Sequence, residues 1–224
     1  MKKAFLENGI DIFNEHQILE MLLFFSKPQG DTNPAAHRLI DTFGSLKNVL
    51  EADHGELCKV DGVGEHTAVL IGFVRELAKK YAVITSLAPD VPIVDTEVLR
   101  GYFESLFLGM KNEEIHALLL DNDLHIVKSR RIIDGSPERV QISARSVADF
   151  VIKNDCSRVV LAHNHPNGIG MPSRTDVEVT AALVYLLSEL DIILCDHIIV
   201  GKDGSCSMRT LDRQQRKEKR IWKE

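Results

Sequence analysis

A short, almost wholly apolar run at residues 158–162 (RVVLA) ends abruptly in a polar segment rich in His, Asn, Pro and Gly. A run of this length bounded by loop residues predicts a strand buried on both faces. The segment 174–190 that follows the loop predicts a helix. Further strands are predicted at 115–120, 124–133 and 192–200. Strands that alternate with helices in this way predict an α/β layer in this half of the chain.

The first third of the sequence has the pattern of short helices. Asn33-Pro34 predicts a helix start, with Asn33 as N-cap and proline at the first helical position, and Gly44 predicts its end. Pro89 and Pro92 lie in a stretch with little periodicity, which predicts a linker. The predicted organisation is a small helical domain over 1–84, a linker over 85–96, an α/β domain over 97–208 and a basic tail over 209–224.

Composition excludes several classes of protein. A hydrophobic fraction of 44% and a charged fraction of 27% are ordinary for a globular chain, and the net charge of −6 argues against a strongly cationic nucleic-acid binder. The four cysteines form no C-x-x-C pair, which argues against a disulfide-stapled secreted domain. The N-terminus does not resemble a signal peptide, and no apolar run reaches the roughly 18 residues of a membrane helix. We therefore expect a cytoplasmic protein with no membrane partner.

His163, His165 and Asp176 are the residues whose spacing most strongly indicates chemistry. Histidines two positions apart in an extended segment point to the same side, and a carboxylate on the next helix can return to them. Two imidazoles and one carboxylate are typical of a catalytic zinc site with an open fourth position. Ser173 and Asp176 also have the spacing of a helix capping box, so Asp176 could cap the helix, bind metal, or do both.

These residues carry a resemblance to a known family. His163-x-His165, ten further residues and then Asp176, with Pro172-Ser173 just before it, resemble the JAMM (MPN+) metalloprotease motif. The longer strings HNHPNG, PSRTD and LCDHIIVG are similar to the bacterial RadC family in particular. The resemblance covers about residues 97–208. It implies an MPN-like mixed β-sheet flanked by helices that binds Zn²⁺ and hydrolyses an amide bond, peptide or isopeptide, in an unknown peptide or protein.

The family pattern also implies a catalytic glutamate at the start of the first strand. Glu113 lies eight residues before Asp121, as the RadC form requires, whereas Glu114 directly precedes the apolar run, as in neighbouring JAMM patterns. We favour Glu113 and keep Glu114 as the alternative, although two acidic residues before a strand are also typical of a solvated strand end. In the implied mechanism the glutamate takes a proton from zinc-bound water, while Ser173 and zinc stabilise the oxyanion.

Residues 57–68 resemble the helix-hairpin-helix module that RadC proteins place in their N-terminal third. Backbone N–H groups at Gly62 and Gly64 would hold a DNA phosphate without reading sequence. Residues 1–84 carry a net charge of −3, and Asp61 and Glu65 flank the glycines, where a phosphate binder would prefer basic residues. We therefore expect at most a weak, non-specific DNA contact, and a purely structural helical domain is the alternative.

Two rival functions share these features. One is a RadC-type adaptor that binds DNA or protein and whose metal site is structural or idle, and the other is a zinc-dependent nuclease. The presence of a glutamate candidate together with Ser173 and the three candidate ligands favours the hydrolase. Asp196 and His197, on the strand predicted at 192–200, either support the metal site or are bonded locally.

Overall fold

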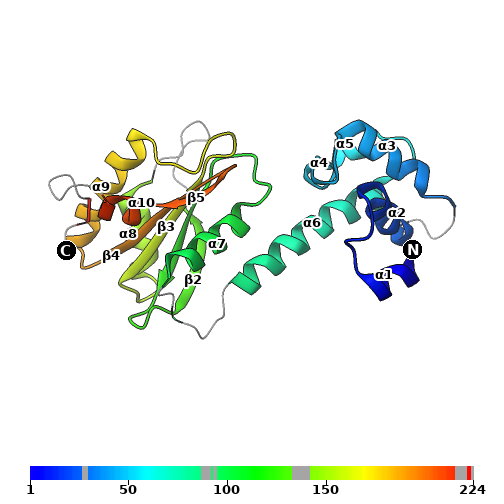
Figure 1. Ribbon diagram of the computed structural model, residues 1–224. Coiled ribbons are helices and arrows are strands. Elements are labelled where there is room, and N and C mark those ends of the chain that lie inside the picture. Colours follow the sequence, from blue (N-terminus) through cyan, green and yellow to red (C-terminus); the bar gives the residue numbers. More distant parts are fainter. Residues whose placement is uncertain (27–29, 87–91, 93–94, 133–141, 215–220, 223–224) are drawn as a thin grey trace. The chain divides into compact units, whose positions relative to one another are not determined.

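The computed structural model describes the chain except for residues 27–29, 87–91, 93–94, 133–141, 215–220 and 223–224 (Figure 1). It contains two compact units, residues 1–81 and 82–224. Most of the predicted linker lies outside the described residues, and the predicted boundaries of the helical domain, α/β domain and tail stay predictions.

The first unit consists of helices. They are α1 (Lys2–Asn8), α2 (Glu15–Ser26), α3 (Asn33–Phe43), α4 (Leu46–Glu51), α5 (His54–Leu57) and α6 (Glu65–Ser86), the last of which ends beyond the unit boundary. Leu19, Leu39 and Ile71 are fully buried in their common core. Gly44 ends α3 in the left-handed conformation, as predicted. The predicted N-cap is wrong by one residue: Thr32 is the N-cap, and its hydroxyl donates to the Glu20 carbonyl of α2.

The segment that connects α5 to α6 contains Gly62 and Gly64. Gly62 has a φ of 87°, a conformation that glycine adopts without strain. Val60 and Val63 are buried in the core of the unit. The Asp61 backbone carbonyl accepts a hydrogen bond from Arg38 Nε, and its carboxylate lies 3.5 Å from Arg38 Nη2, so this basic side chain is held by an acidic residue. A helix-hairpin-helix with a weak DNA contact at these glycines stays a prediction.

The second unit is built on a five-stranded mixed sheet of order β2-β1-β3-β4-β5 (Figure 1). Its strands are β1 (Ile115–Leu120), β2 (Ile126–Ile132), β3 (Arg158–Asn164), β4 (Ile193–Gly201) and β5 (Gly204–Ser207). β3 and β4 are parallel, and the other neighbouring pairs are antiparallel. The helices are α7 (Thr96–Phe107), α8 (Ala144–Ile152), α9 (Arg174–Ser188) and α10 (Met208–Gln214). The predicted fold class, an N-terminal helical region and a mixed sheet flanked by helices, is confirmed.

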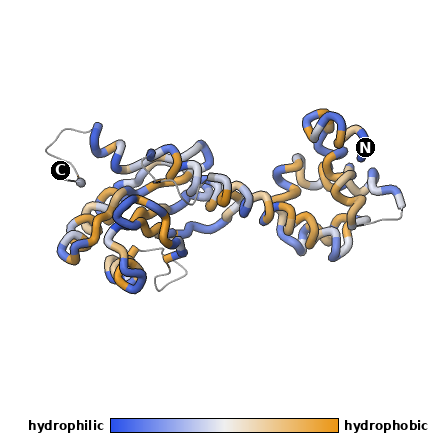
Figure 2. Tube along the Cα trace, turned by 90° about the horizontal axis from the view of Figure 1, so that it is seen from below, coloured by the Kyte–Doolittle hydropathy of each residue, from blue (hydrophilic) through white to orange (hydrophobic). Residues whose placement is uncertain are grey.

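Alternation along the strands sends side chains into two apolar layers. Ala117 and Leu161 pack with α8 and α9 on one face of the sheet. Leu118 and Val160 pack with Phe103 of α7 on the other. Apolar stretches, orange in Figure 2, alternate with polar ones along the helices. The strands are therefore buried on both sides, and their near-continuous apolar sequences follow from this arrangement.

No helix among the described residues is long and apolar enough to cross a bilayer. At the C-terminus, the Asp212 carboxylate accepts the backbone N–H groups of Ile221 and Trp222. The Trp222 indole N–H donates to the Leu194 carbonyl at 2.7 Å. The described end of the predicted basic tail is thus bonded to β4.

The loop after β3 is fastened to the β4–β5 hairpin by a close backbone crossing. Gly170 N–H donates to the Asp203 carboxylate at 2.7 Å, and Lys202 N–H donates to the Gly168 carbonyl at 3.0 Å. A Cβ on Gly170 would collide with the Gly204 carbonyl, and one on Gly201 would collide with the Gly170 backbone. Glycine is required here because any side chain would push the two loops apart.

We predict that Gly170→Ala destabilises the protein by about 1–3 kcal/mol, the typical cost of overpacking. Gly101→Ala is the matched control, because a Cβ there in α7 meets nothing within 4 Å. It should stabilise by up to about 1 kcal/mol through helix propensity. Urea unfolding measures the free energy of unfolding of both variants. Equal values would contradict a backbone crossing at Gly170 that is too close for a side chain.

Candidate metal centre

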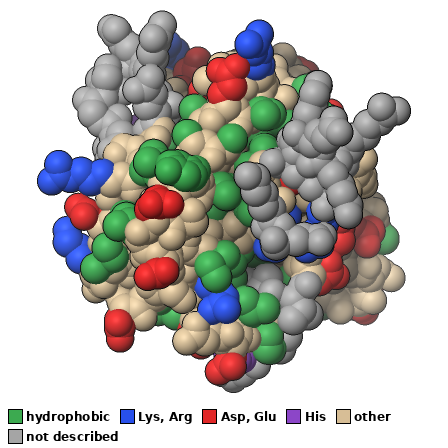
Figure 3. Space-filling view, turned by 90° about the vertical axis from the view of Figure 1, so that its left-hand side faces the viewer, with side chains coloured by type: hydrophobic (Ala, Val, Ile, Leu, Met, Phe, Trp, Pro, Cys, Tyr) green, Lys and Arg blue, Asp and Glu red, His purple; other side chains and the backbone are tan. Residues whose placement is uncertain are grey.

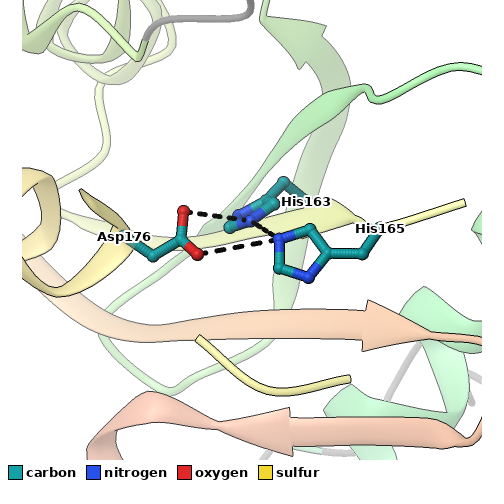
Figure 4. A group of neighbouring side chains, drawn as sticks. All are labelled: His163, His165 and Asp176. Carbon is teal, nitrogen blue, oxygen red and sulfur yellow. Dashed lines mark hydrogen bonds and ion pairs between the residues drawn. The ribbon is translucent and has the colours of Figure 1, made fainter. Parts of the chain in front are cut away.

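His163, His165 and Asp176 converge at the carboxyl end of β3 (Figure 4). His163 Nε2 lies 2.9 Å from His165 Nε2 and 3.3 Å from Asp176 Oδ1. His165 Nε2 lies 3.6 Å from Asp176 Oδ2. Each residue offers one ligand atom, and these atoms all lie within 4.8 Å of one another. The structure therefore brings together the three residues that the sequence predicts as ligands.

The ring of His165 is oriented so that one nitrogen is available to a cation. Its Nδ1 lies 3.1 Å from the Ile169 carbonyl, which can only accept, so Nδ1 carries the proton. Its Nε2 then presents a lone pair to His163 and Asp176. Its backbone N–H donates to the Val200 carbonyl of β4 at 2.7 Å, which fixes the start of the loop. A neutral imidazole with this tautomer is a suitable metal ligand.

Asp176 caps α9 and faces the histidines at the same time. Its Oδ2 accepts the Ser173 N–H at 2.6 Å, and its own N–H donates to Ser173 Oγ, so the predicted capping box is confirmed. Burial of the carboxyl raises its pKa, but hydrogen bonds from His163 and Ser173 outweigh this effect and hold the pKa of Asp176 well below its ordinary value. The carboxyl is thus ionised at neutral pH, as a cation site requires.

The two glutamate candidates point to opposite faces of β1. Glu113 lines the cavity that contains His163, His165 and Asp176. Glu114 does not, because its carboxylate lies 3.1 Å from His116 Nε2 and 3.3 Å from Arg131 Nη1. Alternation in an extended segment gives this result.

Asn164, between the two histidines, holds the backbone on both sides of Glu113. Its Oδ1 accepts the Glu114 N–H at 2.7 Å, and its Nδ2 donates to the Asn112 carbonyl at 3.0 Å. The side chain is buried and its amide has a partner at each end. Sequence reasoning missed this residue. The signal available was its place between the histidines, since alternation directs it to the face opposite theirs.

The cavity has a volume of about 890 Å³ and two kinds of wall. Its polar lining includes Ser173 and the candidate ligands. Apolar side chains line the rest, including Ile115, Val179, Leu183 and Leu186. Figure 3 views the end of this unit that carries α9 and shows apolar side chains interspersed with acidic ones. Such a site can place an apolar part of a ligand beside a polar reaction centre.

Residues from α9, α10 and β4 lie beneath the histidines. His197 is fully buried, 3.0 Å from His163 Nδ1 and 2.7 Å from the Thr180 hydroxyl. Burial, and then the nearby His163, hold the pKa of His197 well below its ordinary value, so the ring is neutral. Asp196 accepts from Ser207 and two backbone N–H groups, so it is bonded locally.

A second group of possible ligands, Asp121, Asp123 and His125, lies between β1 and β2. Asp121 Oδ1 accepts the backbone N–H groups of Asp123 and His125 at 2.9 and 2.8 Å. These hydrogen bonds show that the three residues come together because they form the turn between two strands. None of the three residues lines the cavity of the candidate metal centre.

Residues 93–215 match the family model described as a RadC-like JAB domain. The chain belongs to this family. The RadC resemblance predicted from the sequence strings is thus confirmed for the second unit, whereas the helices of the first unit precede the matched residues and their helix-hairpin-helix assignment stays a prediction.

The RadC-like chain is also similar to curated UPF0758 proteins over almost its whole length. It is 29% identical to one from Rhodobacter capsulatus over 210 residues, covering 93% of this chain and 97% of the relative. It is 29% identical to one from Ruegeria pomeroyi over 209 residues, covering 93% of each. It is 28% identical to one from Fusobacterium nucleatum over 212 residues, covering 91% and 90%. These names state no activity.

The four cysteines are all free, and none of them lines the cavity of the candidate metal centre. Burial raises the pKa of Cys206 to about 11, and it also raises the pKa values of Cys156 and Cys195. Cys58 is exposed. A thiolate mechanism at this site has no candidate residue.

We predict that iodoacetamide at pH 8 modifies Cys58 first and Cys206 last, because the thiolate is the reactive form and Cys206 holds its proton at that pH. Mass spectrometry of tryptic peptides gives the order, and unfolding in urea is the control that exposes all four. Early modification of Cys206 in the folded protein would contradict its raised pKa.

Proposed function

We propose that this RadC-like protein is a zinc-dependent hydrolase of JAMM type that acts on an amide bond, peptide or isopeptide. The convergence of His163, His165 and Asp176 in the lining of a cavity that also receives Glu113 carries the proposal. The proposed compartment is the cytoplasm, which the four free cysteines support.

The donor set suits zinc. Two imidazole nitrogens and one carboxylate oxygen leave a fourth coordination position open, and the His165 tautomer and the ionised Asp176 are the forms that bind a cation. When bound, zinc would supply a Lewis acid that polarises the scissile carbonyl and lowers the pKa of water at the open position. His163 Nε2, His165 Nε2 and a carboxylate oxygen of Asp176 would hold it.

The remaining residues have separate tasks in the proposed reaction. Glu113 accepts a proton from the attacking water and delivers it to the leaving amine. Asn164 orients Glu113 by fixing the peptide groups on either side of it. The Ser173 hydroxyl accepts the Asp176 N–H through its oxygen and has its proton left to donate to the developing oxyanion. The apolar wall around Val179 and Leu186 receives a side chain of the substrate.

The lining of the cavity also bears on the rival functions. Lys111 is the one Lys or Arg among the described residues that line it. A nuclease must hold a charged phosphodiester and usually does so with several cations, so the apolar wall favours an amide substrate. An adaptor with an idle site would not need Glu113 in the cavity. A weak, non-specific DNA contact by the first unit remains compatible with either function.

We predict that the purified protein contains about one zinc per chain and that His163→Ala and Asp176→Asn remove it. Asp176→Asn retains an oxygen that can accept the Ser173 N–H and so keep the cap of α9. Loss of zinc in this variant would therefore result from loss of the carboxylate charge. Elemental analysis measures the stoichiometry, and circular dichroism should show a retained fold because a large apolar core surrounds the site.

His125→Ala is the control for metal binding, because His125 belongs to the second group of possible ligands. It should keep its zinc. If His125→Ala lost the metal while His163→Ala and Asp176→Asn retained it, the site would lie at the β1–β2 turn and the proposed function would fall.

We predict that Glu113→Gln keeps zinc and the fold but lowers hydrolysis roughly 10²–10⁴-fold, the usual cost of losing a positioned general base. A screen of peptide and isopeptide substrates supplies the assay. Glu114→Gln is the matched control and should cost much less, because its carboxylate faces His116 and Arg131 instead. The reverse order would identify Glu114 as the base, and full activity in both variants would exclude the JAMM mechanism.

A further inference from the structure

His197 faces the candidate metal centre because β4 contains an irregularity. Leu194 packs in the layer with α8 and α9, and Ile198 packs in the layer with α7. Residues four apart in a regular strand would share a face. The pairing of β3 with β4 shifts from Val159–Leu194 to Val160–Asp196, which leaves Cys195 as an extra residue. This bulge turns His197 to the side of the sheet that carries His163.

A chain of buried side chains runs from His163 into the protein. His163 Nδ1 lies 3.0 Å from His197 Nε2, and His197 Nδ1 lies 2.7 Å from Thr180 Oγ1. Thr180 Oγ1 lies 3.4 Å from the sulfur of Met208, the first residue of α10. Thr180 and His197 are 0% exposed and Met208 is 3% exposed. Since water does not reach the inner members, each must satisfy its hydrogen bonds within the chain.

The protons in this chain can run in two directions. A neutral imidazole has one N–H, so His197 donates to one neighbour and accepts from the other. If Thr180 donated to His197, the Met208 sulfur would receive no proton from it. If His163 donates to His197 and His197 donates to Thr180, the hydroxyl proton is left for the sulfur, which can only accept. The second direction makes all three of these hydrogen bonds and leaves a lone pair on His163 Nε2. A cation is then needed between that nitrogen and His165 Nε2 and Asp176 Oδ1, which lie 2.9 and 3.3 Å away. The first direction puts a proton on His163 Nε2 that can be donated to these atoms, so it is the direction expected without a metal.

We propose that His197 and Thr180 are positioning residues that, when the site holds a cation, keep the proton of His163 on Nδ1 and its lone pair on Nε2. Nε2 is the atom that lies beside His165 Nε2 and Asp176 Oδ1. The role of this tautomer in metal binding rests on the proposed function. The chain of close contacts itself does not rest on that function.

The two histidines thus reach the same tautomer by different means. The backbone carbonyl of Ile169 holds the proton of His165 Nδ1. At His163 Nδ1 the partner is the His197 ring, which is bonded in turn to Thr180, so this pair accepts the proton that a carbonyl accepts from His165. Thr180 follows Asp176 by four residues, one turn of α9, so a single helix supports one proposed ligand and carries another.

The direct test is the protonation state of His197 in the folded, full-length protein. Two-dimensional ¹⁵N–¹H spectra of histidine-labelled protein distinguish Nδ1–H from Nε2–H rings. We expect His197 to carry its proton on Nδ1 in the zinc-loaded protein. After zinc is removed we expect it on Nε2, because His163 Nε2 then donates to Asp176 or His165 and His163 Nδ1 must accept. A proton on Nε2 of His197 in the zinc-loaded protein would overturn the inference.

The second test is zinc affinity, measured by competition with a chromogenic chelator. Thr180→Val removes the acceptor of His197 at nearly constant shape and should weaken zinc binding roughly 10–100-fold, the usual effect of losing such an outer partner. Thr180→Ser keeps the hydroxyl and should restore the wild-type affinity. A merely structural role would lower the unfolding temperature without this pattern in the dissociation constant.

Thr67→Val is the matched control for burying valine in place of threonine. Thr67 is 2% exposed, and its hydroxyl lies 3.0 Å from Ser26 Oγ in the first unit. It should leave the zinc affinity unchanged. Wild-type zinc affinity in folded Thr180→Val would overturn the inference. If that variant does not fold, the tautomer of His197 in the spectrum of the zinc-loaded wild type is the deciding measurement. Absence of zinc binding in the wild type would overturn the proposed function, whereas zinc binding with the His197 proton on Nε2 would overturn the inference alone.

Discussion

The parallel pairing of β3 with β4 is the contact on which the candidate site depends. Parallel neighbours cannot be joined by a tight turn, so the chain must leave the end of β3, cross over the sheet and return. α9 is that crossover, and it begins next to the point where β3 ends. Asp176 in its first turn therefore meets His163 and His165 as a consequence of topology. On the other side, β1 pairs antiparallel with β3 and places Ile115 opposite His163, which brings the preceding Glu113 to the same edge.

Polar groups at this edge are held by contacts with few alternatives. The Asn164 amide fits between a carbonyl and an N–H of one segment, and the Gly170 crossing leaves no room for a side chain. Unsatisfied polar groups in such a buried place are costly, so each of these contacts restricts the geometry of the others. The result is a rigid set of donors and acceptors beside a cavity that is also lined by apolar side chains. Rigidity of this kind is what a hydrolytic site needs.

Much of this architecture is predictable from local pattern. The run at 158–162 predicted β3, and the family strings led to the RadC-like domain because their spacing reflects a strand, a loop and a helix start in order. The convergence of the histidines with Asp176 was predictable for the same reason. Three features were not. The bulge at Cys195 is set by pairing between strands, and the contacts of Asn164 and Thr180 join segments distant in sequence. The N-cap of α3 lies one residue before Asn33, at Thr32, whose hydroxyl is bonded to α2 rather than to its own helix.

The sulfur of Met208 has a particular value at the inner end of the chain from His163. A glutamine or serine there could both donate and accept, and the hydrogen bonds could then run toward or away from the histidines. A thioether accepts weakly and never donates, so it favours one direction without adding a strong polar group to the core. Met208 is held in turn because the Asp196 carboxylate accepts from Ser207 and from the Arg209 N–H on either side of it. The polar residues of β4 thus fix the start of α10, which places an acceptor and no donor at the inner end of the chain beneath His163.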